Sequence, residues 1–118
     1  MSNTSGASFK RRAPDNLTEE LVAVLSSKAS FEFKPLFDIL LVNLRQRNAA
    51  SGGEEMLRLR AYEKLQGLVN QGAVNRTVNG ITKKYKGVRP RLQTLGAQMK
   101  IIRNEWTLKL AAKAAAAN

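Results

Sequence analysis

Apolar residues recur at helical spacing in three segments of the first two thirds of the chain. The first segment begins after Asn16, which is expected to cap a helix with Glu19 three residues later, as in a capping box. Its apolar stripe ends at Lys28. Residues 31–33 then alternate between apolar and polar positions. This pattern predicts a first helix followed by a break and a short extended segment.

Two further helices are predicted from the same periodicity. The one that starts near Pro35 is apolar nearly all round, which indicates the central helix of the core. The other starts near Glu54 and carries apolar residues from Leu57 to Leu68 at helical spacing. It is expected to end at Gly72, since glycine is a common helix stop.

A β-hairpin is the clearest local prediction in the chain. Asn79 and Gly80 lie between two runs of β-favouring residues, at 73–78 and 81–88. Asn-Gly is a preferred two-residue hairpin loop, because both residues tolerate a positive φ. The sequence therefore predicts two antiparallel strands joined at this dipeptide.

The expected loop fixes which side chains face each other across the hairpin. It places Val78 opposite Ile81 and Arg76 opposite Lys83. Like charges directly opposite destabilise a strand pair by up to about 1 kcal/mol, a cost that an anion bound between them would remove. Tyr85 lies on the same face and is expected either to stack on a base or to pack in the core.

A long helix is predicted after the hairpin, with Pro90 in its first turn. Its apolar residues follow alternating steps of three and four: Leu92, Leu95, Met99, Ile102 and Trp106. This stripe fits a short coiled-coil seam between two copies or packing against the domain equally well. Residues 111–117 favour helix but have nothing to bury, so this end is expected to fray.

Together these elements predict a mainly α fold with one β-hairpin, of the α+β class. We expect a flexible basic arm at residues 1–15, where apolar surface is scarce. A single domain is expected over residues 16–110, including the last helix. Residues 111–118 form the Ala-rich frayed tail.

Charge is distributed unevenly along the 118 residues. The chain has 20 Lys and Arg against 9 Asp and Glu, a net charge of +11. No acidic residue falls between Lys64 and Asn104, and that stretch contains these bases: Lys64, Arg76, Lys83, Lys84, Lys86, Arg89, Arg91, Lys100 and Arg103. A stretch of basic residues without acidic ones is typical of a surface that contacts a phosphate backbone. A polyanionic partner is therefore expected.

The residue types that are missing narrow the chemistry. Cysteine and histidine are both absent, which excludes disulfides, thiolate or imidazole metal sites and Cys or His catalysis. No nucleotide-binding loop, secretory signal or membrane-spanning run is present. Glu54 and Glu55 are explained by charge at a helix N-terminus better than by a Mg²⁺ site. We expect a cytoplasmic, nucleoid- or ribosome-associated protein that is not an enzyme and uses neither a metal nor a cofactor.

The passage from the third helix into the hairpin has a distinctive order of features. It reads YEKLQGLVNQGAVNR at 62–76, then NG at 79–80 and KKY at 83–85. This run of helix, Gly-aliphatic-Val step and basic hairpin resembles the winged helix-turn-helix DNA-binding superfamily over residues 54–88. The loop at residues 48–53 departs from the pattern, because it is long for the turn before a recognition helix.

The resemblance implies a winged-helix-like fold with three helices, a hairpin wing and a long C-terminal helix that forms a dimer seam. The third helix would enter the major groove, and the wing would lie along the backbone or the minor groove. The bases this places against DNA are, on the helix, Arg58, Arg60 and Lys64, and, at the hairpin tip, Arg76, Lys83 and Lys84.

The leading hypothesis is a non-enzymatic nucleic-acid-binding protein, with DNA favoured over RNA. Its candidate contact residues are Arg58, Arg60, Lys64, Arg76, Lys83, Lys84, Lys86, Arg89, Arg91, Lys100 and Arg103. One alternative is a ribosomal or ribosome-associated RNA-binding protein. Another is an assembly module that uses the C-terminal helix, with oligomerisation, including a homodimer, through Leu92, Leu95, Met99, Ile102 and Trp106.

Overall fold

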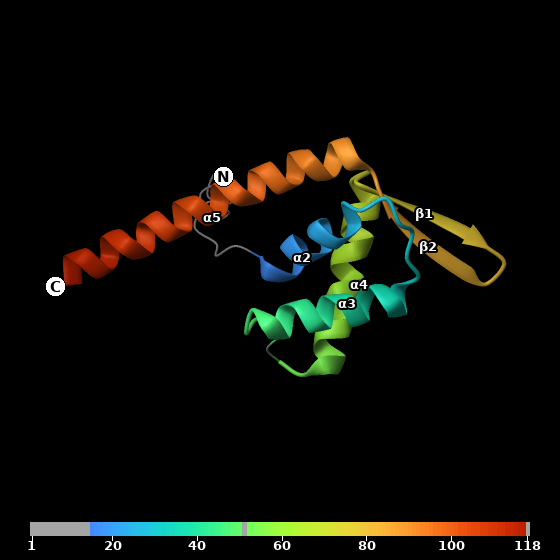
Figure 1. Ribbon diagram of the computed structural model, residues 1–118, viewed down its shortest axis with the longest axis horizontal. Helices are drawn as coiled ribbons and strands as arrows, with labels where there is room; N and C mark the ends of the chain where they lie inside the picture. Colours follow the sequence, from blue (N-terminus) through green and yellow to red (C-terminus); the bar gives the residue numbers. More distant parts are fainter. Residues whose placement is uncertain (1–14, 51, 118) are drawn as a thin grey trace, which may run out of the picture.

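The computed structural model describes residues 15–50 and 52–117. Of the arm expected at residues 1–15, residues 1–14 lie outside the described part, and Asp15 belongs to the folded domain as the N-cap of α2. In the described part, four helices and one hairpin follow in the order α2 (Asn16–Leu25), α3 (Phe33–Gln46), α4 (Glu54–Asn70), β1 (Val74–Asn79), β2 (Thr82–Gly87) and α5 (Arg89–Ala117). Figure 1 shows α2, α3 and α4 on one side of α5, with the hairpin projecting at one end and α5 extending from the other. The predicted mainly helical α+β fold with one hairpin is confirmed.

The core forms where the apolar stripes of α2, α3 and α4 meet. The stripe predicted for α4 is buried as expected, at Leu57, Ala61, Leu65 and Leu68. In α3 the prediction was too broad, because Ile39 and Val42 are exposed and only one face packs inward. No helix among the described residues is long and apolar enough to cross a membrane.

The first helix begins one residue earlier than the sequence suggested. Asp15, and not Asn16, is the N-cap, and its carboxylate accepts hydrogen bonds from the backbone N–H groups of Leu17 and Thr18 at 3.1 and 3.3 Å. Aspartate caps a helix as well as asparagine does, so composition alone did not separate the two. Asn16 is thereby free to accept hydrogen bonds from elsewhere in the fold.

The expected extended segment before α3 is present, but it is shorter than predicted. Phe31 pairs with Tyr85 of β2 through two backbone hydrogen bonds of 2.9 and 2.7 Å. Phe33 already belongs to α3, which leaves Pro35 in the first turn, where a missing N–H breaks no helical hydrogen bond. Phe31 therefore adds a short third strand position beside β2.

The hairpin forms where predicted, but its register differs. Its two loop residues are Gly80 and Ile81, and Asn79 pairs with Thr82. Gly80 has φ +64° and Ile81 has no positive φ, the pattern of a type II′ turn with glycine first. Asn79-Gly80 suits a type I′ turn, whereas Gly80-Ile81 suits a type II′ turn. The Asn-Gly dipeptide alone therefore did not decide which two residues form the loop.

The new register separates the two like charges that were expected to face each other. Arg76 lies opposite Tyr85, and Lys83 lies opposite Val78. Each side chain nevertheless stays on its predicted face, because strand faces alternate with period two and the register differs by an even step. The expected anion site directly between Arg76 and Lys83 is therefore wrong, whereas both bases remain on the Tyr85 face.

The final helix packs on the domain only through its first half. Leu92 is fully buried in the core, while Leu95 and Met99 are partly buried against it. Ile102 and Leu110, on the same face, are exposed. Leu92 is therefore a core residue and cannot also form an interface between copies, which corrects its predicted role. The helix runs to Ala117, and fraying of its Ala-rich end stays a prediction.

Candidate nucleic-acid interface

The hairpin projects from the domain and carries bases on both of its faces. Every residue of β1 after Val74 is exposed, so only the root of the ribbon is packed. Lys83 lies on the Tyr85 face, whereas Lys84 and Lys86 lie on the opposite face. All three lysines are exposed, and none forms an ion pair within the described residues.

The start of α5 continues this charge from the root of the hairpin. Arg89 and Arg91 are exposed, and no acidic residue lies in the first turn of α5. The positive end of the helix dipole adds to their potential. Neither arginine pairs with a carboxylate in residues 15–50 and 52–117. We call the five side chains of this region the basic surface: Lys83, Lys84, Lys86, Arg89 and Arg91.

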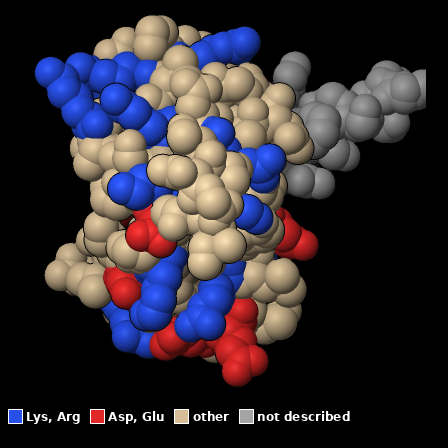
Figure 2. Space-filling model, turned by 90° about the vertical axis from the view of Figure 1, so that its right-hand side faces the viewer, with Lys and Arg blue, Asp and Glu red and all other residues tan. Residues whose placement is uncertain are grey.

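Figure 2 shows how sharply the charges separate on the face from which the hairpin projects. Its upper part carries basic side chains without acidic ones, while acidic side chains appear only lower down, interspersed with bases. Unpaired positive charge that is held on one side of a small domain raises the local concentration of anions there.

The root of the hairpin is fixed by Tyr85, which is 1% exposed. Its hydroxyl accepts a hydrogen bond of 3.3 Å from Gln66 Nε2, and Gln66 Oε1 accepts one of 3.4 Å from Arg76 Nη1. This chain of contacts ties β1 and β2 to α4. Of the two roles expected for Tyr85, packing in the core is therefore the one it takes, because its ring is not accessible to a base.

The bases of α4 do not form a charged face for a groove of DNA. Arg58 pairs with Glu54 at 3.4 Å and lies over the ring of Phe37. Lys64 pairs with Asp15 at 2.9 Å, and Arg60 lines the same depression as Asp15 and Lys64. Arg58 and Lys64 thus pair with acidic residues, and Arg60 lies in a depression of the domain surface beside Asp15.

The side of α4 directly opposite its buried stripe is apolar and acidic, while Arg58, Arg60 and Lys64, which are exposed as well, lie along its flanks. Met56, Leu59 and Tyr62 are exposed there, together with Glu55 and Glu63. Leu59 and Tyr62 line an open depression of about 370 Å³ with Phe33, and Glu55 and Arg58 lie at its edge. Carboxylates and apolar side chains facing outward are unsuited to the phosphate-flanked major groove. The structure therefore separates Arg58, Arg60 and Lys64 from the basic surface.

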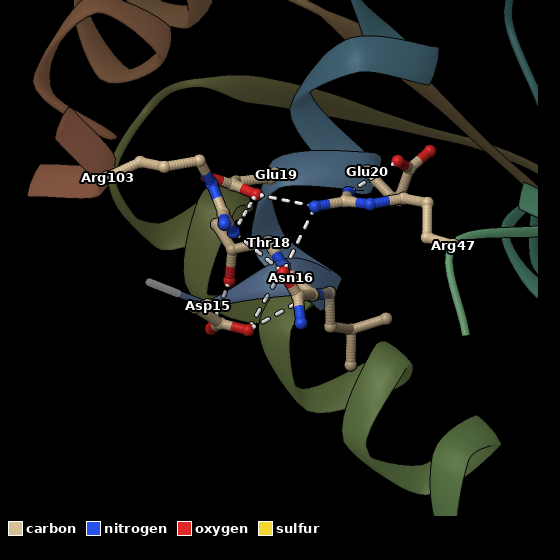
Figure 3. Close-up of polar contacts among 8 residues, drawn as sticks. Asp15, Asn16, Thr18, Glu19, Glu20, Arg47 and Arg103 are labelled. Atoms are coloured by element: carbon tan, nitrogen blue, oxygen red, sulfur yellow. Dashed lines mark hydrogen bonds and ion pairs between the residues drawn. The ribbon is translucent and has the colours of Figure 1, made fainter. Parts of the chain in front are cut away.

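Arg103 is held in a polar cluster that joins three helices, shown in Figure 3. Its guanidinium makes a bidentate contact with Glu19, with Nε and Nη2 donating at 2.8 and 2.7 Å, and Nη2 also donates to Asn16 Oδ1. Arg47 at the end of α3 donates to Glu19, Glu20 and Asn16. The cluster therefore fixes the direction in which α5 leaves the domain.

The cluster also sets the ionisation of its central carboxylate. Burial by itself raises the pKa of Glu19, but hydrogen bonds and charge attraction from Arg103 and Arg47 outweigh burial and hold this pKa below its ordinary value. Glu19 is therefore ionised wherever the chain is folded near neutral pH. The positive charge of Arg103 is offset, so Arg103 is a structural residue, unlike the arginines at the start of α5.

Lys100 stands apart from the basic surface as well. It is exposed on α5, beside the apolar depression between α2 and α5 that Met99 and Arg103 also line. It lies about three helical turns beyond Arg89, on the part of α5 that runs away from the hairpin, although like the five it has no ion pair among the described residues. Of the eleven predicted contact residues, the structure thus groups the five of the basic surface, with Arg76 beside them.

Sequence reasoning missed two features of this region. The cluster around Glu19 escaped notice because Glu19 and Glu20 were explained by the helix dipole, and their arginine partners lie 28 and 84 residues away from Glu19. The exposed tip residue Ile81 was missed because the expected register paired it with Val78. The Glu19 cluster depends on contacts between residues far apart in the sequence. The exposure of Ile81 depends on the turn type of the hairpin.

Among the described residues, no group of three or more acidic side chains is placed to hold a metal ion. Comparisons with protein-family models, curated proteins and solved structures find no match to this chain. The role of the chain must therefore be inferred from its own side chains and their arrangement.

Proposed function

We propose that this chain is a non-enzymatic nucleic-acid-binding protein that docks its hairpin and the start of α5 on the phosphate backbone. One observation carries the proposal: the five side chains of the basic surface are exposed and, within the described residues, lack carboxylate partners. Six bases elsewhere in the fold do have such partners: Lys34, Arg45, Arg47, Arg58, Lys64 and Arg103. Lys28, after α2, and Lys100, Lys109 and Lys113, along α5, also lack carboxylate partners among the described residues, but they lie outside the basic surface. Several unbalanced charges gathered on one surface are what counterion release from a polyanion exploits.

The element order supports a winged-helix interpretation of this docking. Three helices precede a hairpin, and Phe31 between the first two adds a strand position beside β2. The hairpin is then the wing. Because the side of α4 opposite its buried stripe is apolar and acidic, and Arg58 and Lys64 on its flanks pair with acids, we assign the nucleic-acid contact to the wing and to α5 instead of α4. Such contacts position a protein on a backbone without reading its sequence.

The proposal predicts measurable binding to duplex DNA that weakens steeply with salt. Labelled duplex DNA, structured RNA and single strands would be titrated by fluorescence anisotropy at 50 and 200 mM salt. We expect a Kd for duplex DNA of about 10⁻⁴–10⁻⁶ M at physiological salt, with little dependence on sequence. Tighter binding to structured RNA would favour the ribosome-associated alternative, and no binding to any of the three would refute the proposal.

We further propose that α5 pairs with a second copy of the chain. The stripe that packs on the domain at Leu95 and Met99 continues past the domain edge through Ile102, Trp106 and Leu110, with Ile102 and Leu110 exposed. Within the described residues Trp106 is half-buried, whereas Ile102 and Leu110 on either side of it stay exposed. An equivalent stripe on another α5 is the self-complementary partner that a two-fold dimer requires.

Replacing Ile102 and Leu110 by glutamate is expected to convert a dimer into a monomer. Light scattering after gel filtration would report a mass near 13.0 kDa for the variant and twice that mass for the unaltered chain. Ile101 and Leu108 are exposed on the opposite side of α5, so the same change there is the matched control and should leave the dimer intact. A monomeric unaltered chain would contradict the pairing.

A further inference from the structure

An apolar side chain stands alone at the tip of the basic hairpin. Ile81 is 100% exposed, and Val78, near the end of β1, is 55% exposed. Two-residue hairpin loops favour Gly, Asn and Asp, whereas a β-branched side chain there has nothing to pack against. Isoleucine at this position therefore adds nothing to the stability of the domain. A contact with a partner is the role that would account for it.

The surroundings of the tip favour a phosphate-flanked partner. Lys83 lies on one face of the ribbon, and Lys84 and Lys86 lie on the other. Bases on both faces are suited to a groove that has a phosphate strand along each side. No acidic residue occurs from Ala73 to Val88, so nothing on the hairpin repels such an approach.

The shape of the tip suits the minor groove of a duplex. That groove is about 6 Å wide, too narrow for an α-helix, whereas proteins that bind DNA through β-ribbons use either groove. Beyond the last strand pair, Asn79 with Thr82, only Gly80 and Ile81 remain, and Gly80 has no side chain. Ile81 is therefore the side chain that reaches furthest, and proteins that enter the minor groove use isoleucine among other apolar residues as a wedge between base steps.

We propose that Ile81 inserts between base pairs from the minor groove and kinks the duplex; this proposal rests on the nucleic-acid-binding function proposed above. The lysines on the two faces hold the flanking phosphates, while the side chain partly unstacks one step. A lipid surface is the less suitable partner. Even a myristoyl chain, with far more apolar surface than one isoleucine, binds membranes only marginally.

Fluorescence of 2-aminopurine placed within A·T steps of a duplex reports unstacking, and energy transfer between labelled duplex ends reports bending. We expect the unaltered chain to raise the fluorescence and to bend the duplex by about 20–90°. Ile81→Ser should lose both signals, because serine suits a turn but offers no wedge, while Ile81→Leu should retain them. The salt dependence of binding should be unchanged, since isoleucine carries no charge.

Ile101→Ser removes an exposed isoleucine from α5 and is the matched control, expected to keep both signals. Salt-sensitive binding without unstacking or bending would overturn the wedge while leaving the proposed function intact. Absence of DNA binding altogether would overturn both. Binding to vesicles of phosphatidylcholine and phosphatidylserine that is lost in Ile81→Ser, with no unstacking of DNA, would overturn the wedge in favour of a lipid contact.

Discussion

Gly87→Ala is expected to destabilise the fold by about 3 kcal/mol, at the upper end of what overpacking costs. Gly87 ends β2, where the strand passes directly over the last turn of α2. A Cβ at this position would overlap the backbone carbonyl oxygen of Leu25 and the side chain of Leu92. Because a backbone atom cannot move aside as a side chain can, the strand itself must shift. Urea unfolding followed by circular dichroism measures the loss.

The matched control is the same substitution at Gly67, inside α4. A Cβ there would meet no atom within 4 Å, so alanine adds helix propensity without a clash. Gly67→Ala should therefore raise the free energy of unfolding by up to about 1 kcal/mol. Equal unfolding midpoints for Gly87→Ala and the unaltered chain would contradict the close approach of β2 to α2, and with it the placement of the hairpin.

Replacing Lys83, Lys84 and Lys86 by glutamine is expected to weaken binding to duplex DNA by roughly 100-fold at 0.1 M salt. Each lost phosphate contact removes about 0.9 from the slope of log K against log salt, so the slope should fall by nearly 3. The three side chains are exposed, so the fold should be unaffected. Anisotropy titrations over a series of salt concentrations measure both quantities.

A second triple variant removes the same charge from elsewhere on the molecule. Lys34 and Arg45 pair with Asp38 and Glu54 on the surface of the helical core, and Lys109 lies far along α5. Replacing these three by glutamine should change the affinity several-fold at most, through net charge alone. Equal losses in both triple variants would mean that binding follows total charge and not the basic surface.

Local patterns were sufficient to predict the helices and the existence of the hairpin. The buried stripe of α4, from Leu57 to Leu68, follows from spacing within one element, and the end of α4 just before Gly72 follows from glycine as a helix stop. Such signals need no knowledge of distant contacts. The boundaries were less certain, because Asp15 and Asn16 are equally good caps and Phe33 enters α3 ahead of Pro35.

The hairpin register could not be predicted from the same information. Asn79-Gly80 and Gly80-Ile81 each make an acceptable two-residue loop, in different turn types. What local sequence cannot include is the packing of Tyr85 in the core and its pairing with Phe31, more than fifty residues away. The side-chain faces were predicted correctly because both registers share the same alternation.

The candidate site was predicted in its charge but not in its extent. Sequence identified every base of the block that begins at Lys64, yet it could not tell which of them meet an acid in the fold. Lys64 pairs with Asp15, and Arg103 pairs with Glu19, which lie 49 and 84 residues away in the sequence. The bases between these two positions have no carboxylate partner in the part of the chain that the structure describes, and neither do Lys28, Lys109 and Lys113 outside the block.

The basic surface is expected to bind a polyanion through about five phosphate contacts. A titration of the unaltered chain with duplex DNA across 50–300 mM salt tests it most directly. We predict a linear plot of log K against log salt with a slope of about −4 to −5, as five contacts require. A slope between 0 and −1, or no binding at 50 mM salt, would contradict the account.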